Sequence, residues 1–229
     1  MITLVLLPGL DGTGTLFDQL VDALQGAVPT KVVAYPPDLA VGYETLELIA
    51  ERLLPQQGPI VLLGESFSGP IAIALAAKHP DRIKGLILCC TFVSRPRPLL
   101  APFSFLAKIA PIKALPVCIS SIPLLGRYST PDLKTRLKAA LASVSGAVLR
   151  TRLQAAMSVD ASKELMHVKV PVLYLQALHD WVVPRRVAST IKQIQPHTAV
   201  VEVRGPHCLL QAAPTETAQL IREFMRKAR

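Results

Sequence analysis

The sequence contains few cysteines, and their spacing excludes two classes of small stabilised domain. Four cysteines occur among 229 residues, and two of them, Cys89 and Cys90, are adjacent. A disulfide framework is typical of much shorter chains that are richer in cysteine. No Cys-x-x-Cys pair and no Cys/His cluster with the spacing of metal ligands is present. We therefore predict buried thiols, with neither a disulfide framework nor a metal site.

Long uncharged segments are also missing. The longest segment without Asp, Glu, Lys or Arg is residues 114–126, which is 13 residues long and contains two prolines. A helix needs about 20 predominantly apolar residues to cross a bilayer. The first residues, MITLVLLPGLDG, lack a basic region and run into a glycine-rich loop, which favours a strand over a signal peptide. We therefore expect no stable membrane insertion and a cytoplasmic location.

Charged residues are scarce at 18%, whereas hydrophobic residues make up 51% of the chain. This composition excludes disorder, and the length fits one large α/β domain. Apolar runs rich in Val, Ile and Leu alternate with amphipathic segments, which indicates a mostly parallel sheet flanked by helices. The six expected strands are residues 2–7, 31–35, 60–63, 85–90, 172–176 and 199–203. The expected helices between them are residues 16–24, 43–54, 68–78, 187–194 and 215–227.

One interval breaks this alternation. Residues 94–169 contain no strand-like run, prolines crowd their first third, and helical periodicity extends from about 131 to 156. We therefore predict a helical insertion at 94–169, with residues 1–93 and 170–229 forming the α/β core. The net charge is −4 over 1–93, +9 over 94–169 and +4 over 170–229. Because the insertion alone matches the +9 of the whole chain, we do not expect a nucleic-acid partner.

Ser66 follows a buried run and precedes an alanine-rich helix, in the segment IVLLGESFSG at residues 60–69. A nucleophile elbow places its serine at such a turn with positive φ, where bulky residues two positions away would collide. Gly64 satisfies this requirement, and Ser68 stands where the usual Gly-x-Ser-x-Gly pattern has its second glycine. Serine is small enough to keep the turn. We predict that Ser66 is a nucleophile; the alternative is an ordinary strand-to-helix turn with a capping serine.

A serine nucleophile needs a base, and the base needs an acid that orients it. In sheets of this kind the acid follows a later strand and the histidine follows the last strand. Asp180 comes directly after the fifth expected strand, and His207 comes after the sixth. Both loops open at the same sheet edge as Ser66. We therefore predict that Ser66, Asp180 and His207 are the catalytic residues.

Other residues compete for these roles. His179 adjoins Asp180, but neighbouring side chains at the end of a strand diverge. Three further histidines are expected at the opposite edge of the sheet: His79, His167 and His197. Asp160 is the alternative acid, because some hydrolases take their acid from an earlier loop.

The third requirement is a pair of N–H donors for the oxyanion. The backbone N–H of Phe67 follows the nucleophile directly, and we predict that it is one donor. For the second we predict the N–H of Leu10, in the glycine-rich loop PGLDGTG after the first strand. A phosphate-binding loop is the competing interpretation. Its glycine spacing does not match the known nucleotide motifs, and Asp11 would repel a phosphate.

With these residues in this order, the chain resembles the α/β-hydrolases, in the compact subgroup of serine esterases and lipase-like enzymes with a helical cap. The resemblance covers nearly the whole length and rests on Gly64, Ser66, Gly69, Asp180, Val183, Pro184 and His207. It departs from the family in two ways. Pro8-Gly9 stands where a His-Gly pair is common, and the antiparallel hairpin that usually leads the sheet is missing, so a six-stranded sheet is expected. Serine at position 66 excludes the branches that use aspartate as nucleophile.

The resemblance implies hydrolysis of carboxylic esters with small to medium acyl chains through an acyl-enzyme, without a metal or organic cofactor. The insertion at 94–169 is then a cap over the site. Its apolar residues are expected on the underside: Leu99, Leu100, Phe103, Phe105, Leu106, Ile109, Ile112 and Leu115. The residues predicted to line the substrate pocket are Asp11, Phe103, Phe105 and Trp181.

The basic residues of the cap are expected on its outside: Arg95, Arg97, Lys108, Lys113, Arg127, Lys134, Arg136, Lys138, Arg150 and Arg152. They form either a solvated surface or a docking site, as in the pimeloyl-carrier-protein methyl esterases, whose layout is similar. The alternatives to a small-ester hydrolase are therefore an ester or thioester hydrolase that docks an acidic acyl-carrier protein, and a non-catalytic ligand-binding member of the fold. A cationic cap could also touch an anionic membrane surface.

Overall fold

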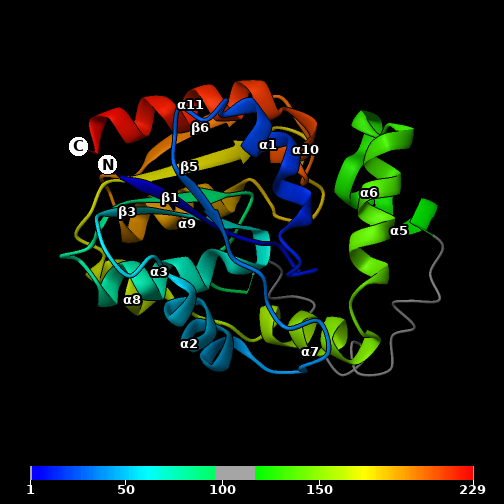
Figure 1. Cartoon of the computed structure of the whole chain (residues 1–229), viewed down its shortest axis with the longest axis horizontal. Helices are drawn as coiled ribbons and strands as arrows, with labels where there is room; N and C mark the ends of the chain where they lie inside the picture. Colours follow the sequence, from blue (N-terminus) through cyan, green and yellow to red (C-terminus); the bar gives the residue numbers. More distant parts are fainter. Residues whose placement is uncertain (1, 96–116, 229) are drawn as a thin grey trace.

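A computed structural model describes residues 2–95 and 117–228, and its centre is one six-stranded sheet (Figure 1). The strands lie in the order β2-β1-β3-β4-β5-β6, and all five pairings are parallel. Their bounds are β1 Thr3–Leu7, β2 Thr30–Val32, β3 Ile60–Glu65, β4 Ile83–Cys89, β5 Val172–Ala177 and β6 Ala199–Val203. The six predicted strands are confirmed, with ends shifted by up to three residues.

Helices cover both faces of this sheet (Figure 1). The helices on one face are α1 Asp18–Ala23, α10 Leu209–Ala212 and α11 Pro214–Lys227, and those on the other are α2 Tyr43–Leu53, α3 Gly69–Lys78, α8 Ser162–His167 and α9 Arg186–Ile194. The central strands are buried on both sides, as parallel strands between helix layers must be. Along β3, Leu62 packs into the core cluster of α2 and α3, whereas Val61 and Leu63 pack into that of α1 and α11.

The segment between β4 and β5 contains helices in its described part. They are α5 Val117–Leu125, a short 3-10 turn η4 Gly126–Tyr128, α6 Pro131–Ala142 and α7 Gly146–Ala156, followed by α8. The helical periodicity expected over 131–156 is divided between two helices. α6 ends at Ala142, and Ser145 begins the second helix because its hydroxyl accepts the backbone N–H of Val148 and so caps α7. Two of these helices reach the core cluster that also holds the residues of α3: α7 through Ala156 and α8 through the fully buried Leu165.

One prediction about this segment is wrong. Arg152 was expected on the outside with the other basic residues, but its side chain is fully buried. It lies on the stripe of α7 that also buries Val148 and Ala156, at intervals of four residues, so it faces inward. Three backbone carbonyls accept its hydrogen bonds there. Of the other expected basic residues, Arg97, Lys108 and Lys113 lie outside the described residues.

A helix that crosses a bilayer must be both long and predominantly apolar. Across residues 2–95 and 117–228, no helix combines the length and the apolar character that a bilayer crossing requires.

Candidate active site

Ser66 occupies a sharp turn between β3 and α3. Its φ is +47°, a left-handed backbone conformation that non-glycine residues rarely adopt. A Cβ added to Gly64 would lie 2.8 Å from the carbonyl oxygen of Ser68, so a larger residue cannot fit there. Gly69 is equally confined, because its added Cβ would overlap the side chain of Thr91. The local sequence therefore holds the serine in a strained position at the carboxyl end of the sheet.

The three predicted catalytic residues meet in space. Ser66 Oγ lies 2.8 Å from His207 Nε2, and His207 Nδ1 lies 2.8 Å from Asp180 Oδ2. The side chains of His207 and Asp180 are 5% and 4% exposed. If Nδ1 carries the proton that the carboxylate accepts, Nε2 is free to accept the serine proton. The arrangement has the geometry of a serine nucleophile, its base and an orienting acid.

The competing residues lie elsewhere. The ring of His179 is bonded through Nε2 to Arg127 at 2.9 Å and through Nδ1 to the Tyr128 hydroxyl at 3.0 Å. Asp160 is exposed and accepts the backbone N–H of Ser162. The remaining histidines have other surroundings: His79 bonds Glu51, His167 bonds the carbonyl of Lys163, and His197 is exposed. In the part of the chain that the structure describes, no group of three His, Cys, Asp or Glu side chains could hold a metal ion.

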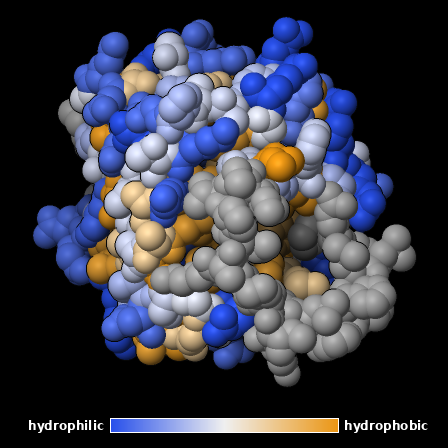
Figure 2. Space-filling model, turned by 90° about the vertical axis from the view of Figure 1, so that its right-hand side faces the viewer, coloured by the Kyte–Doolittle hydropathy of each residue, from blue (hydrophilic) through white to orange (hydrophobic). Residues whose placement is uncertain are grey.

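An apolar cavity of about 360 Å³ opens beside Ser66. Its described lining consists of Leu10, Ser66, Phe67, Phe92, Arg95, Pro123, Leu124, Leu153, Ala156, Met157, Trp181, Val182 and His207. Figure 2 looks onto this side of the molecule, where hydrophobic surface gathers near the centre and hydrophilic side chains surround it. The cavity can hold a small apolar group directly against the serine hydroxyl.

The predicted pocket residues have different outcomes. Trp181 lines the cavity and is 60% exposed. Asp11 is absent from the described lining, and its carboxylate instead accepts the backbone N–H and the hydroxyl of Thr13, at 3.1 and 3.0 Å. Burial raises the pKa of Asp11. Phe103 and Phe105 lie outside the described residues, as do the other apolar residues expected on the underside of the insertion.

The loop after β1 and the turn at Ser66 are joined by buried hydrogen bonds. Leu10 and Phe67, the two predicted oxyanion donors, both line the cavity. Ser68 donates its hydroxyl hydrogen to the carbonyl of Pro8 and therefore accepts from the Tyr35 hydroxyl, 2.8 Å away. The serine that replaces the usual glycine thus connects the nucleophile turn to the loop of Leu10.

Two further contacts fix the nucleophile turn, and neither was predicted from the sequence. The Thr91 hydroxyl, just after β4, donates to the carbonyl of Ser66, and the Tyr174 hydroxyl donates to the carbonyl of Thr91 at 2.8 Å. Tyr43 stacks on the ring of Phe67 at 4.6 Å, and its hydroxyl donates to the Phe67 carbonyl at 2.9 Å. Thr91 follows β4, Tyr174 lies in β5 and Tyr43 begins α2. No local sequence pattern therefore links them to Ser66.

Glu65 is a buried acid directly before the nucleophile. Its side chain is 6% exposed, and its Oε1 accepts a 3.0 Å hydrogen bond from the Gln211 amide. The pKa of Glu65 is raised to about 7, chiefly by burial and in part by the charge of nearby Asp11, whereas the Gln211 amide, the charge of His207 and the backbone N–H of Gly9 oppose the shift. The sequence signal for this buried acid was a glutamate at the end of an otherwise apolar strand.

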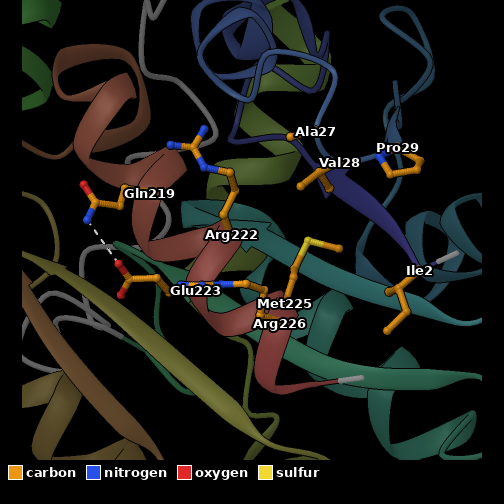
Figure 3. Close-up of a pocket in the computed structure, with 9 residues that line it drawn as sticks. All are labelled: Ile2, Ala27, Val28, Pro29, Gln219, Arg222, Glu223, Met225 and Arg226. Carbon is orange, nitrogen blue, oxygen red and sulfur yellow. Dashed lines mark hydrogen bonds between the residues drawn. The ribbon is translucent and has the colours of Figure 1, made fainter.

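A second cavity lies at the opposite, amino-terminal edge of the sheet (Figure 3). It measures about 470 Å³ and is lined by Ile2, Ala27, Val28, Pro29, Gln219, Arg222, Glu223, Met225 and Arg226. Its polar side chains come from α11, where Gln219 donates to Glu223 at 3.1 Å. None of the residues named in this lining is a serine, cysteine or histidine, so this cavity is not the candidate active site.

The chain is similar to several known proteins. A family model described as "Alpha/beta hydrolase family" matches residues 4–220. The pimeloyl-[acyl-carrier protein] methyl ester esterase of Yersinia enterocolitica is 29% identical over 211 residues, 82% of this chain and 78% of that protein. The pyrethroid hydrolase of Sphingobium wenxiniae is 25% identical over 190 residues, 77% of this chain and 67% of that protein. The solved enol-lactonase of Burkholderia xenovorans has the same fold, with a TM-score of 0.83 at 18% identity over 97% of this chain and 90% of its own.

Proposed function

The chain belongs to the alpha/beta hydrolase family, and on that premise we propose that it is a serine hydrolase that cleaves carboxylic esters. The observation that carries this proposal is the 2.8 Å distance between Ser66 Oγ and His207 Nε2 at the mouth of an apolar cavity. The names of its similar proteins, a methyl ester esterase and a pyrethroid hydrolase, support hydrolytic chemistry of this type.

In the first step, Ser66 Oγ attacks the ester carbonyl carbon while His207 Nε2 takes the hydroxyl proton. The tetrahedral intermediate collapses, the bond to the alkoxy group breaks, and His207 returns the proton to the departing alcohol. A water molecule then attacks the acyl-enzyme by the reverse sequence, which releases the acid and restores Ser66. Asp180 holds His207 in the tautomer with the proton on Nδ1 and stabilises the imidazolium.

The negative charge that develops on the carbonyl oxygen needs donors already in place. We assign these donors to the backbone N–H groups of Leu10 and Phe67, which flank Ser66 in the cavity lining. Removal of a single oxyanion donor costs roughly 10² to 10³ in kcat in a well-studied protease. In support of this assignment, buried hydrogen bonds hold the loop of Leu10 and the turn at Ser66 in place.

Substrate size follows from the cavity. A space of about 360 Å³ with mostly apolar walls suits an acyl chain of small to medium length. We assign residues 94–169 as a cap on a core formed by residues 1–93 and 170–229. In support of this, the insertion supplies six of the described lining residues, namely Arg95, Pro123, Leu124, Leu153, Ala156 and Met157.

The test is a series of p-nitrophenyl esters from acetate to decanoate, with Ser66→Ala as the matched control. We expect the wild type to hydrolyse the shorter esters and to react covalently with a fluorophosphonate probe at Ser66. The Ser66→Ala variant should lose both properties while keeping its thermal unfolding temperature. A wild type that hydrolyses no ester or thioester and is not labelled would instead be a non-catalytic ligand-binding member of the family, and the proposal would be wrong.

A second candidate function is hydrolysis of an ester or thioester carried by an acidic acyl-carrier protein. The observation that favours it is a group of arginines around His179: Arg127 lies 2.9 Å from His179 Nε2, and the pKa of His179 is lowered by desolvation and by the charges of Arg127, Arg204 and Arg185. The methyl ester esterase of Yersinia enterocolitica is named for a carrier-linked substrate. Arg152 cannot contribute to such docking, because it is buried.

This candidate predicts a specific salt dependence. Activity on a carrier-linked ester should fall steeply between 50 and 300 mM NaCl, whereas activity on p-nitrophenyl butyrate should change little, because exposed charges are screened over about 10 Å at 0.1 M salt. The Arg127→Gln and Arg204→Gln substitutions should reduce the slope, with the exposed Lys84→Gln at the amino-terminal end of β4, the opposite edge of the sheet, as control. Equal salt responses for both substrates would exclude carrier docking and leave the small-ester hydrolase.

A further inference from the structure

Arg152 is a buried cation whose hydrogen bonds all go to backbone carbonyls. Its side chain is fully buried, and Nη1 donates to the carbonyls of Leu10 at 3.1 Å and Asp11 at 2.6 Å. Nη2 donates to the carbonyl of Pro36 at 3.0 Å. Its guanidinium carbon also lies 5.5 Å from the centre of the Tyr35 ring. One side chain of α7 therefore reaches three segments of the core around the loop of Leu10.

Packing of α7 alone does not explain an arginine at this position. Burial lowers the pKa of the Arg152 guanidinium, and the effects of Tyr35 and Asp11, which favour the charge, do not offset this desolvation. The described residues include no carboxylate within ion-pair distance of it, and its Nε is buried without a hydrogen-bond partner. A methionine or leucine would complete the apolar stripe of Val148 and Ala156 without this desolvation cost. What only arginine supplies is a rigid planar fork that donates to several carbonyls at once.

The loop that Arg152 binds contains the proposed oxyanion donor Leu10. Its carbonyls are held from several directions: Pro8 by Ser68, Leu10 and Asp11 by Arg152, and Gly12 by the backbone N–H of Tyr35 at 2.8 Å. The Leu10 N–H lies in the rigid peptide plane directly before that of the Leu10 carbonyl, so bonds to the carbonyls of Leu10 and Asp11 anchor the backbone on the C-terminal side of this donor. Without Arg152, the carbonyls of Leu10 and Asp11 would lose the only side-chain donor described for them.

Gly12 shows how closely the guanidinium lies against the loop. Its φ is +72°, and a Cβ added there would overlap the Arg152 guanidinium. The glycine therefore serves both the turn and the close approach of the arginine. The same helix also lines the cavity through Leu153 and Ala156, so the wall that contacts a substrate and the anchor of the loop belong to one helix.

We propose that Arg152 is a positioning residue that holds the loop of residues 9–12 so that the Leu10 N–H points at the oxyanion. The inference rests on the proposed ester hydrolysis and adds a residue to it. Arg152 does not touch the reacting atoms; it acts through the backbone of Leu10 and Asp11. It also makes α7 of the insertion part of the catalytic machinery as well as a wall of the cavity.

The experiment compares Arg152→Met and Arg152→Lys with the control Arg150→Met, two residues away on the same helix. For p-nitrophenyl butyrate we expect kcat of Arg152→Met to fall about 10- to 100-fold, less than the loss of a whole oxyanion donor, with KM changed less than threefold. Arg152→Lys should recover part of this loss, because it keeps the charge and can donate to one carbonyl. Affinity for a boronic acid that mimics the tetrahedral intermediate should fall in parallel with kcat.

A second measurement does not depend on turnover. Hydrogen exchange of a peptide that spans residues 8–14 should become faster in Arg152→Met, and it should be unchanged in Arg150→Met. If Arg152→Met does not fold, Arg152→Lys carries the same comparison with a smaller expected effect.

The outcomes separate this inference from the proposed function. An active wild type with an equally active Arg152→Met variant, or with a change confined to KM, overturns the inference and leaves ester hydrolysis intact. Unchanged exchange in the loop also overturns it. A wild type without hydrolysis or labelling at Ser66 overturns the proposed function, and the positioning role in catalysis is then rejected with it.

Discussion

His207 Nδ1 lies 2.8 Å from Asp180 Oδ2, while Oδ1 of the same carboxylate accepts the backbone N–H groups of Val182 and Val183 at 2.7 and 2.8 Å. Both oxygens of Asp180 are therefore used, and the carboxylate has one orientation. The two backbone bonds close a tight turn after β5 and fix the side chain that the histidine meets. The residue acts at once as the cap of its own loop and as the partner of His207.

The first prediction concerns the tautomer of His207. In Asp180→Asn, the amide oxygen should keep the bonds from Val182 and Val183, so that the NH₂ group faces Nδ1. Nδ1 must then accept, the proton moves to Nε2, and the ring can no longer take the proton of Ser66. We expect kcat for p-nitrophenyl butyrate to fall about 10⁴-fold, as for the equivalent change in a serine protease, with little change in unfolding temperature.

The control for this substitution is Asp160→Asn, which changes the acid that the sequence left as an alternative. The Asp160 carboxylate is exposed and accepts the backbone N–H of Ser162, so activity should stay within about twofold of the wild type. A large loss in Asp160→Asn with none in Asp180→Asn would reverse the assignment of the acid.

The second prediction concerns Ser68, which bridges the nucleophile turn and the loop of Leu10. Ser68→Ala leaves the carbonyl of Pro8 and the hydroxyl of Tyr35 without their buried partner. We expect a loss of about 1 to 3 kcal/mol in the free energy of unfolding, together with a lower kcat. Urea denaturation measures the first effect, and the exposed Ser189→Ala on α9 is the control.

A double-mutant cycle with Tyr35→Phe tests whether the two hydroxyls act together. Because Tyr35 and Ser68 are 2.8 Å apart, the double variant should lose less stability than the sum of the single variants, by about 1 kcal/mol. Strictly additive losses would mean that the hydrogen bond contributes nothing to stability.

The sequence predicted the sheet and the three residues at its carboxyl edge because both depend on local order. Parallel strands bring their following loops to one edge, so the position of Ser66, Asp180 and His207 after three strands was enough to place them together. The order of these strands and loops can be predicted from the sequence without knowing how the side chains pack.

The surroundings of Ser66 could not be predicted in the same way. Arg152 was expected at the surface because charged residues are seldom buried, yet its acceptors Leu10 and Pro36 lie more than a hundred positions away in the sequence. One signal was present: Arg152 falls on the inward stripe of α7, four residues after Val148. Glu65 gave a similar signal. In both cases the partner that stabilises the buried charge is set by tertiary structure, which a local pattern does not contain.

The third prediction concerns the choice of acyl chain. Trp181 lines the cavity and is 60% exposed, so a long acyl chain can cover its ring, whereas an acetyl group leaves it in water. In Trp181→Ala we expect KM for p-nitrophenyl hexanoate to rise about tenfold, which corresponds to about 1.4 kcal/mol of lost apolar contact. KM for the acetate should change less than twofold.

The matched control is Ile122→Ala. Ile122 is similarly exposed, at 53%, but it is not among the described lining residues. Its removal should leave the preference between hexanoate and acetate unchanged. An equal shift in both variants would place the acyl chain outside the cavity.

The fourth prediction concerns the buried acid Glu65 and the dependence of stability on pH. The folded chain raises the pKa of Glu65 from its ordinary 4.5 to about 7, chiefly because the side chain is buried. Between these two values the folded state binds more protons at this position than the unfolded state does. Stability from this group is therefore fully present below pH 4.5, falls as the pH rises to about 7, and stays constant above.

Glu65→Gln removes this titration while keeping a side chain of the same shape that can bond the Gln211 amide. A pKa raised from 4.5 to about 7 corresponds to about 3 kcal/mol in the free energy of unfolding. The free energy of unfolding of Glu65→Gln minus that of the wild type should therefore rise by up to this amount between pH 4.5 and pH 8. Urea titrations at both pH values measure the difference, and the other titrating groups cancel because both proteins contain them. The exposed Glu216→Gln on α11 should show no such rise. If Glu65→Gln also shows none, Glu65 titrates as it does in the unfolded chain, and the carboxylate beside Ser66 is charged at neutral pH.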